Sequence, residues 1–286
     1  MTYYRSIIIV LFLLLPLSVQ AGVRNFVAPL TASKWEVTSE KQQCHLTHVI
    51  PAYGKVVFSR YQGTGFSAKV LTGDEPRGSK MAFLRSVPPS WKGHEIKDLG
   101  EVHMSNNRVP FRFSHDITAQ LLAELEDGMS PTLYYQDNKR SEHYTAVVIS
   151  SVNFNVGYEK FHECISELLP FGFDDIRKSA VHFGVDSAML SWPDKEKLDH
   201  IVKYMEIDQG VAKVNINGHT SNTGSDRRNR TLSKKRAEVV KKYLAGKGLP
   251  EEKLKTRGHS YRKPAATNKT EKGRALNRRS EIGLVK

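Results

Sequence analysis

The residues best suited to chemistry lie between positions 216 and 237, where the sequence reads INGHTSNTGSDRRNRTLSKKRA. The pattern indicates the end of a strand, a polar loop over residues 217–224, and a helix that opens near Ser225 or Asp226, whose oxygens suit an N-cap. A loop at a helix N-terminus offers unpaired N–H groups and a partial positive charge. On the helix, Arg236 adds a planar fork of donors that fits a carboxylate. The stretch predicts a receptor for a small acid.

This stretch resembles the peptidoglycan-binding loop and helix of OmpA-like domains. The family pattern is GHTD, then N-x-x-L-S-x-x-R-A, and N-R-R near the end. The residues that match it here are Gly218, His219, Thr220, Asn229, Leu232, Ser233, Arg236, Ala237, Asn277, Arg278 and Arg279. One position departs from the pattern, because Ser221 stands where the family has Asp.

The resemblance implies that the site binds diaminopimelate, a zwitterion of the peptidoglycan stem peptide. In the family, the Asp and the Arg jointly bind this zwitterion. Arg236 is therefore expected to bind the carboxylate, whereas Ser221 leaves the ammonium group without its usual partner. Ser221→Asp is therefore expected to tighten binding. The predicted peptidoglycan-binding residues are Gly218, Thr220, Ser221, Asn222, Asn229, Leu232, Arg236 and Arg278.

Each of these residues also has a plainer interpretation. Arg236 lies beside two lysines and fits a solvated helix charge, and residues 220–222 fit ordinary turn residues that bond their own backbone. Leu232 fits the core first and a pocket wall second. Arg278 and Arg279 alternate along the last predicted strand, so only one of them can face the site, and we choose Arg278.

The sequence gives no support for catalysis. It holds no GxSxG or HExxH motif, and its 11 histidines are scattered without Cys or carboxylate partners at metal-ligand spacing. We predict a binding module and not an enzyme, with no cofactor and no metal.

The charge of the chain is unevenly distributed. Residues 213–286 hold 21 Lys and Arg against 6 Asp and Glu, a net charge of +15, whereas residues 1–212 carry 22 against 24, a net charge of −2. A basic region suggests nucleic acid in an intracellular protein. Residues 1–21, however, have a basic n-region, an apolar run over residues 7–17 and small residues before Gly22, as in a cleaved signal peptide. We therefore expect a periplasmic protein without a transmembrane span, whose basic surface meets the anionic cell wall.

Two cysteines, Cys44 and Cys164, would lie in that oxidising compartment, so a disulfide is expected. It would stabilise the fold by roughly 4 to 5 kcal/mol in the chain-entropy model. The alternative is two buried free thiols.

The remaining patterns predict two domains with a connector. Residues 22–152 carry short strand patterns at 56–58, 66–70, 81–84, 109–113 and 144–148 and a helical pattern between Asp116 and Gly128. Residues 153–175 are expected to be a packed connector with a short helix around Cys164.

Residues 176–286 alternate between strands and helices. Strands are predicted at 181–185, 211–216, 254–258 and 279–285, and helices begin near Trp192 and Ser225. The order β-α-β-α-β-β is that of an OmpA-like α/β sandwich, with parallel pairing and both helices on one face of the sheet. The whole chain is predicted to be α+β, with a β-rich N-terminal domain carrying one helix.

The N-terminal domain resembles that of the MotY family of flagellar motor proteins. The matching segments are residues 35–36 (WE), 44–48 (CHLTH), 51–54 (PAYG), 57–59 (VFS), 88–91 (PPSW), 125–126 (LE), 131–132 (PT), 135–137 (YQD) and 164–166 (CIS). The resemblance implies a T ring around the rod and P ring of the basal body, built with a MotX-like partner, that captures stator units. The alternatives are a peptidoglycan-anchored envelope protein without a flagellar role and a cell-wall hydrolase.

Overall fold

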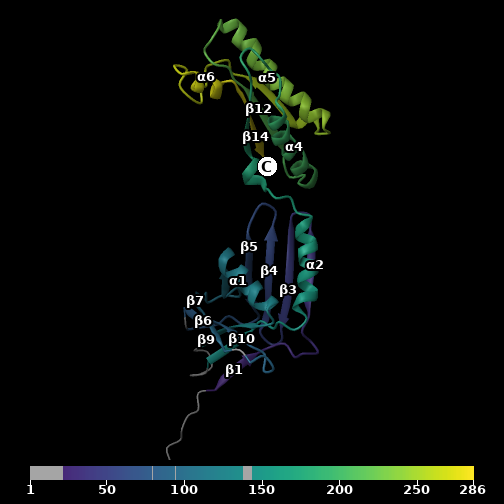
Figure 1. The fold of residues 1–286 in the computed structure, drawn as a ribbon, viewed down its shortest axis with the longest axis vertical. Coiled ribbons are helices and arrows are strands. Elements are labelled where there is room, and N and C mark those ends of the chain that lie inside the picture. Colours follow the sequence, from purple (N-terminus) through teal and green to yellow (C-terminus); the bar gives the residue numbers. More distant parts are fainter. Residues whose placement is uncertain (1–21, 79, 94, 138–143) are drawn as a thin grey trace, which may run out of the picture.

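The computed structural model of the protein describes residues 22–78, 80–93, 95–137 and 144–286. The predicted signal peptide, residues 1–21, lies outside the described residues. The described chain forms two bodies that follow one another along the long axis (Figure 1). Each body has its own cluster of buried hydrophobic side chains. Within these ranges, no helix is both long and apolar enough to cross a membrane.

The first body contains two five-stranded sheets, with the orders β1-β10-β9-β6-β7 and β2-β3-β4-β5-β8. Its strands are β1 (Val23–Phe26), β2 (Trp35–Glu40), β3 (Gln43–Ile50), β4 (Gly54–Tyr61), β5 (Phe66–Thr72), β6 (Met81–Val87), β7 (Lys97–His103), β8 (Phe111–Phe113), β9 (Ser130–Gln136) and β10 (Tyr144–Val148). The predicted strands fall on β4, β5, β6, β8 and β10, and the one at 109–113 is shorter than expected.

Helix α1 (His115–Glu126) lies at the predicted position. Leu121, Leu122 and Leu125 point into the first core because they share one face at helical spacing. The helix ends before Gly128, whose φ of 77° is a left-handed conformation that glycine adopts without strain.

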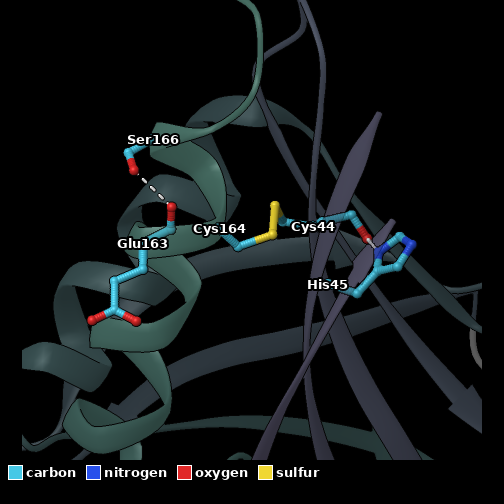
Figure 2. Close-up of a disulfide and its surroundings, with 6 residues drawn as sticks. Cys44, His45, Glu163, Cys164 and Ser166 are labelled. Atoms are coloured by element: carbon cyan, nitrogen blue, oxygen red, sulfur yellow. Dashed lines mark hydrogen bonds between the residues drawn. A yellow bond between two sulfur atoms is a disulfide. The ribbon is translucent and has the colours of Figure 1, made fainter. Parts of the chain in front are cut away.

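Helix α2 (Phe154–Ser166) is longer than the short helix predicted around Cys164. It lies against β2 and β3, beside β3 in Figure 1, and buries Phe154 and Phe161 in the first core. Cys164 is joined to Cys44 of β3, so the predicted disulfide is confirmed and the alternative of two free thiols is wrong (Figure 2). The helix is therefore fixed to the first body by packing and by a covalent bond.

The second body follows a short helix, α3 (Phe173–Ile176). Its elements are β11 (Lys178–His182), α4 (Trp192–Ile207), β12 (Lys213–Gly218), α5 (Asp226–Gly246), a 3-10 turn (Glu251–Lys253), β13 (Leu254–Gly258), α6 (Glu271–Asn277) and β14 (Arg279–Val285). The sheet order is β11-β14-β12-β13, and α4 and α5 lie on one face of it (Figure 1). The predicted fold class is confirmed.

Three details of the second body differ from the prediction. The first strand ends at His182 and not at residue 185, because its last pairing is with Arg279 of β14. Helix α6 was not expected; Thr270 caps it by accepting a hydrogen bond from the Gly273 amide at 3.1 Å. Parallel pairing joins only β12 to β13, because the antiparallel β14 separates β11 from β12.

Candidate functional site

A pocket of about 390 Å³ opens where the β11–α4 loop, the β12–α5 loop, α5 and α6 meet. Its lining residues are Val185, Asp186, Thr220, Ser221, Thr223, Gly224, Arg228, Asn229, Leu232, Arg236, Glu271, Arg274 and Arg278. The structure therefore brings together Thr220, Ser221, Asn229, Leu232, Arg236 and Arg278 of the predicted set. Gly218 and Asn222 lie outside the lining, and Arg279 turns away to pair with Glu281.

Arg236 is fully buried, so the interpretation of a solvated helix charge is wrong. Its Nε, Nη1 and Nη2 donate to the carbonyls of Ser187, His219 and Gly184 at 2.8, 2.9 and 3.0 Å. The guanidinium also lies 5.1 Å from the centre of the Phe183 ring. Burial, followed by the charge of Arg278, lowers the pKa of Arg236 to about 10, which leaves it protonated at neutral pH. A guanidinium has five N–H groups, so one on Nη1 and one on Nη2 remain for a ligand.

The β12–α5 loop is held by the backbone and by Asn229. The His219 amide donates to Arg279 O at 2.8 Å, and Asn229 Nδ2 donates to Thr223 O at 3.1 Å. Thr220 is 3% exposed, and within the described chain its Oγ1 has no hydrogen-bond partner. Buried hydroxyls are normally bonded, so this one marks a position where a ligand can supply the missing partner.

The charges around the pocket favour an anion. Four arginines and two carboxylates line it. Asp186 is paired with Arg228. Glu271 is paired with Arg274 and Arg278. Hydrogen bonds from Arg278 and Arg274 lower the pKa of Glu271. At neutral pH the lining therefore carries a net charge of +2. Four lining residues were not predicted from the sequence: Asp186, Arg228, Glu271 and Arg274. Thr270 followed by Glu271 is nevertheless a helix-start signal that could have located α6.

Gly218 positions α5 and does not touch the pocket. A Cβ on Gly218 would lie 1.9 Å from Ser233 O and 3.1 Å from Ala237 N. The missing side chain therefore lets α5 pack directly on β12, which places Arg236 over the loop carbonyls.

Gly218→Ala is expected to lower the free energy of unfolding by about 1–3 kcal/mol, because α5 must move away from the sheet. Urea unfolding measures this change, with Gly283→Ala as the matched control, since nothing lies within 4 Å of a Cβ there. Equal stabilities of the two variants would show that the close approach at Gly218 is not limiting.

His219 and His259 stack with their ring centres 5.1 Å apart. His219 Nε2 lies 3.5 Å from Glu281 Oε2. Burial, assisted by the charge of Arg279, lowers the pKa of His219 to about 4. Within the described ranges, no three His, Cys, Asp or Glu side chains lie together as a metal site would require.

The low pKa of His219 predicts a loss of stability in acid. The ring stays neutral in the folded protein down to about pH 4, whereas the unfolded chain takes up its proton below about pH 6.5. The free energy of unfolding is therefore expected to fall by about 2–3 kcal/mol between pH 7 and pH 4.5 through this residue. Chemical unfolding at both pH values would show a smaller decrease for His219→Asn than for the wild type, and equal decreases would assign the effect to other groups.

Two segments of the chain match known protein families. Residues 26–170 match the family described as the MotY N-terminal domain, and residues 182–278 match the OmpA family. The peptidoglycan-binding protein ArfA of Mycobacterium tuberculosis is 40% identical over 102 residues, which are 36% of this chain and 31% of that protein. A crystal structure of the peptidoglycan-associated lipoprotein from Burkholderia pseudomallei matches 37% of this chain and 89% of its own, with 25% identity and a TM-score of 0.36.

One relative is similar over nearly the full length. The sodium-type flagellar protein MotY of Vibrio parahaemolyticus is 31% identical over 268 residues, which cover 91% of this chain and 90% of that protein. Together with the match to the MotY N-terminal domain, which spans half of the sequence, this similarity shows that the chain belongs to the MotY family.

Proposed function

We propose that this protein is a periplasmic, non-enzymatic component of the flagellar motor that anchors the motor to peptidoglycan. The observation that carries the proposal is the buried Arg236 at the floor of a cationic pocket, with two N–H groups left for a carboxylate. The unpaired hydroxyl of Thr220 in the same lining adds a neutral partner. Membership of the MotY family and the name of its flagellar relative support the role in the motor.

In this proposal the ligand is the diaminopimelate of the stem peptide. Arg236 binds a carboxylate, and Thr220, Ser221 and Arg278 contact the remaining polar groups. Asn229 shapes the loop, Leu232 supplies an apolar wall, and Gly218 lets the helix approach. Asn222 is exposed, and its backbone N–H donates a hydrogen bond to Asn268 Oδ1 at 3.3 Å.

The two bodies have different binding roles in this proposal. Residues 22–152 dock on the basal body at the P ring and rod and on a MotX-like partner. Residues 153–175, whose helix α2 is fixed to the first body, lead to residues 176–286, which hold the cell wall. The assembly is the T ring, which captures stator units around the basal body. The disulfide between β3 and α2 supports this division, because it makes the first body a firm support for the second.

Sedimentation with purified sacculi tests the anchoring role. Residues 22–286, purified with the disulfide intact, are expected to pellet with sacculi and to be released by free meso-diaminopimelate. Protein that stays in the supernatant would contradict the proposal, and release of soluble muropeptides would indicate a hydrolase instead.

A deletion strain tests the motor role. Loss of swimming, restored by the wild-type gene, together with co-purification of the protein with basal bodies is the expected result. A fully motile deletion strain would favour an envelope anchor without a flagellar role.

A further inference from the structure

The pocket is lined by two carboxylates, although position 221 carries none. Ser221 is buried in the lining and carries no charge. Among the described lining residues, the carboxylates belong to Asp186 on the β11–α4 loop and Glu271 at the start of α6. A zwitterionic ligand needs a negative partner for its ammonium group, so these two residues are the candidates.

Asp186 is fixed in place by the residue that would bind the carboxylate. Arg236 donates to the carbonyls of Gly184 and Ser187, on either side of Asp186. Asp186 itself has a φ of 51°, a left-handed conformation that non-glycine residues rarely adopt unless their surroundings impose it. The loop therefore presents the Asp186 carboxylate at the pocket beside the Arg236 guanidinium.

Asp186 is paired with one arginine, whereas Glu271 is paired with two. Each Asp186 oxygen accepts one hydrogen bond from Arg228, from Nε at 3.0 Å and from Nη2, so each keeps a second lone pair. Glu271 also accepts two hydrogen bonds, from Arg274 Nε and from Arg278 Nη1 at 2.9 Å each, and Arg274 Nη2 lies 2.8 Å from its Oε2, so two cations already compete for this carboxylate. The Asp186 side chain is 50% exposed, so a ligand can reach it.

The electrostatics agree with this geometry. The hydrogen bond from Arg228, and to a smaller extent the charge of Arg236, lowers the pKa of Asp186, so its carboxylate is ionised at neutral pH. Asp186 in turn is the carboxylate whose charge raises the pKa of Arg236. The two opposite charges therefore act on one another within the same pocket.

We propose that Asp186 receives the ammonium group of the ligand while Arg236 receives its carboxylate, so that the pocket selects an amino-acid end over a simple carboxylate. The hydroxyls of Thr220 and Ser221 line the same pocket and accept the remaining N–H groups of the ammonium. The inference rests on the proposed function, since it names the specificity of the same site.

Calorimetric titration of the full mature chain with two ligands tests the assignment. The ligands are meso-diaminopimelate and pimelate, which has the same carbon chain and both carboxylates but no ammonium. The wild type is expected to bind meso-diaminopimelate more tightly than pimelate. Asp186→Asn is expected to lower the affinity for meso-diaminopimelate by about ten- to a hundredfold, the effect of losing a charged hydrogen bond. The affinity for pimelate is expected to stay within about twofold of the wild-type value.

Three further variants separate ligand contact from loop support. Asp226→Asn removes an aspartate that pairs with Arg230 outside the pocket and is expected to change neither affinity. Arg228→Gln removes the partner of Asp186 and is expected to keep the preference for meso-diaminopimelate. Adding Ser221→Asp to Asp186→Asn is expected to restore that preference, because it returns a carboxylate to the pocket.

The outcomes distinguish this inference from the proposed function. If the wild type binds both ligands and Asp186→Asn weakens both equally, or weakens neither, Asp186 is a support for the loop and the inference is overturned. Loss of the preference in Arg228→Gln to the same extent as in Asp186→Asn would overturn it as well. If the wild type binds neither the two ligands nor sacculi, the proposed function itself fails.

Discussion

Alanine in place of Arg236 is expected to abolish retention on sacculi and to lower the free energy of unfolding by about 3–6 kcal/mol. Three carbonyls lose their donor, of which the His219 carbonyl is buried and the other two are part-buried, and an unpaired polar group costs about 1–3 kcal/mol where it is buried. Phe183 also loses the guanidinium that lies over its ring. The sequence alone suggested a tenfold to hundredfold effect on binding, whereas the structure adds a large effect on the fold, because the same side chain joins two loops to α5.

Urea unfolding and sacculus sedimentation measure the two effects separately. Lys235→Ala is the matched control, since it removes an exposed charge from the adjacent position of α5 and is expected to change neither result. Arg236→Lys keeps the charge but not the planar fork, so it is expected to lose binding and part of the stability. A stable Arg236→Ala protein that still pellets with sacculi would remove Arg236 from both roles.

A second variant keeps the binding test independent of folding. Thr220→Val removes a hydroxyl that bonds no described residue, so the stability is expected to stay the same or rise. Its affinity for sacculi is expected to fall by about threefold to tenfold, the value of one neutral hydrogen bond. Unchanged affinity would place the ligand away from Thr220.

The position of Arg236 follows from the sequence, but its burial does not. The N-cap, the helix and the match of the GHT turn fix where the side chain lies along α5, and each of these signals is local. Two neighbouring lysines make the same position look exposed. The burial comes from the loop at Gly184 and Ser187, about fifty residues earlier in the chain, and only the tertiary fold brings it over the guanidinium. Asp186 escaped the sequence analysis for the same reason.

The fold shows the same division between local and long-range signals. Helices with a cap and an apolar face, such as α1, α4 and α5, were predicted near their observed bounds. Strand β11 was placed three residues too late, because the alternation of residues 181–185 continues beyond the last pairing with β14. The position of β14 between β11 and β12 depends on the tertiary fold, which a linear order of elements does not contain.

Removal of the disulfide is expected to destabilise the first body by about 4–5 kcal/mol. Cys44 and Cys164 are 120 residues apart, and a loop of that length gives this value in the chain-entropy model. Both sulfurs belong to the first core, where Phe154 and Phe161 of α2 pack with Trp35 and its neighbours. Without the bond, α2 is held on β2 and β3 by packing alone.

The double variant Cys44→Ala, Cys164→Ala measures this contribution in urea, with oxidised wild type as the reference. Trp35 is a suitable fluorescent reporter, because it is 9% exposed and its ring centre lies 5.0 Å from that of Phe154 on α2. The second body has its own core and contains the whole pocket, so the affinity for meso-diaminopimelate is expected to stay unchanged. If affinity fell together with stability, the two bodies would not be independent, and the pocket would need the first body to keep its shape. If neither changed, α2 would be held by its aromatic packing, and the bond would add nothing to the support that the first body gives the anchor.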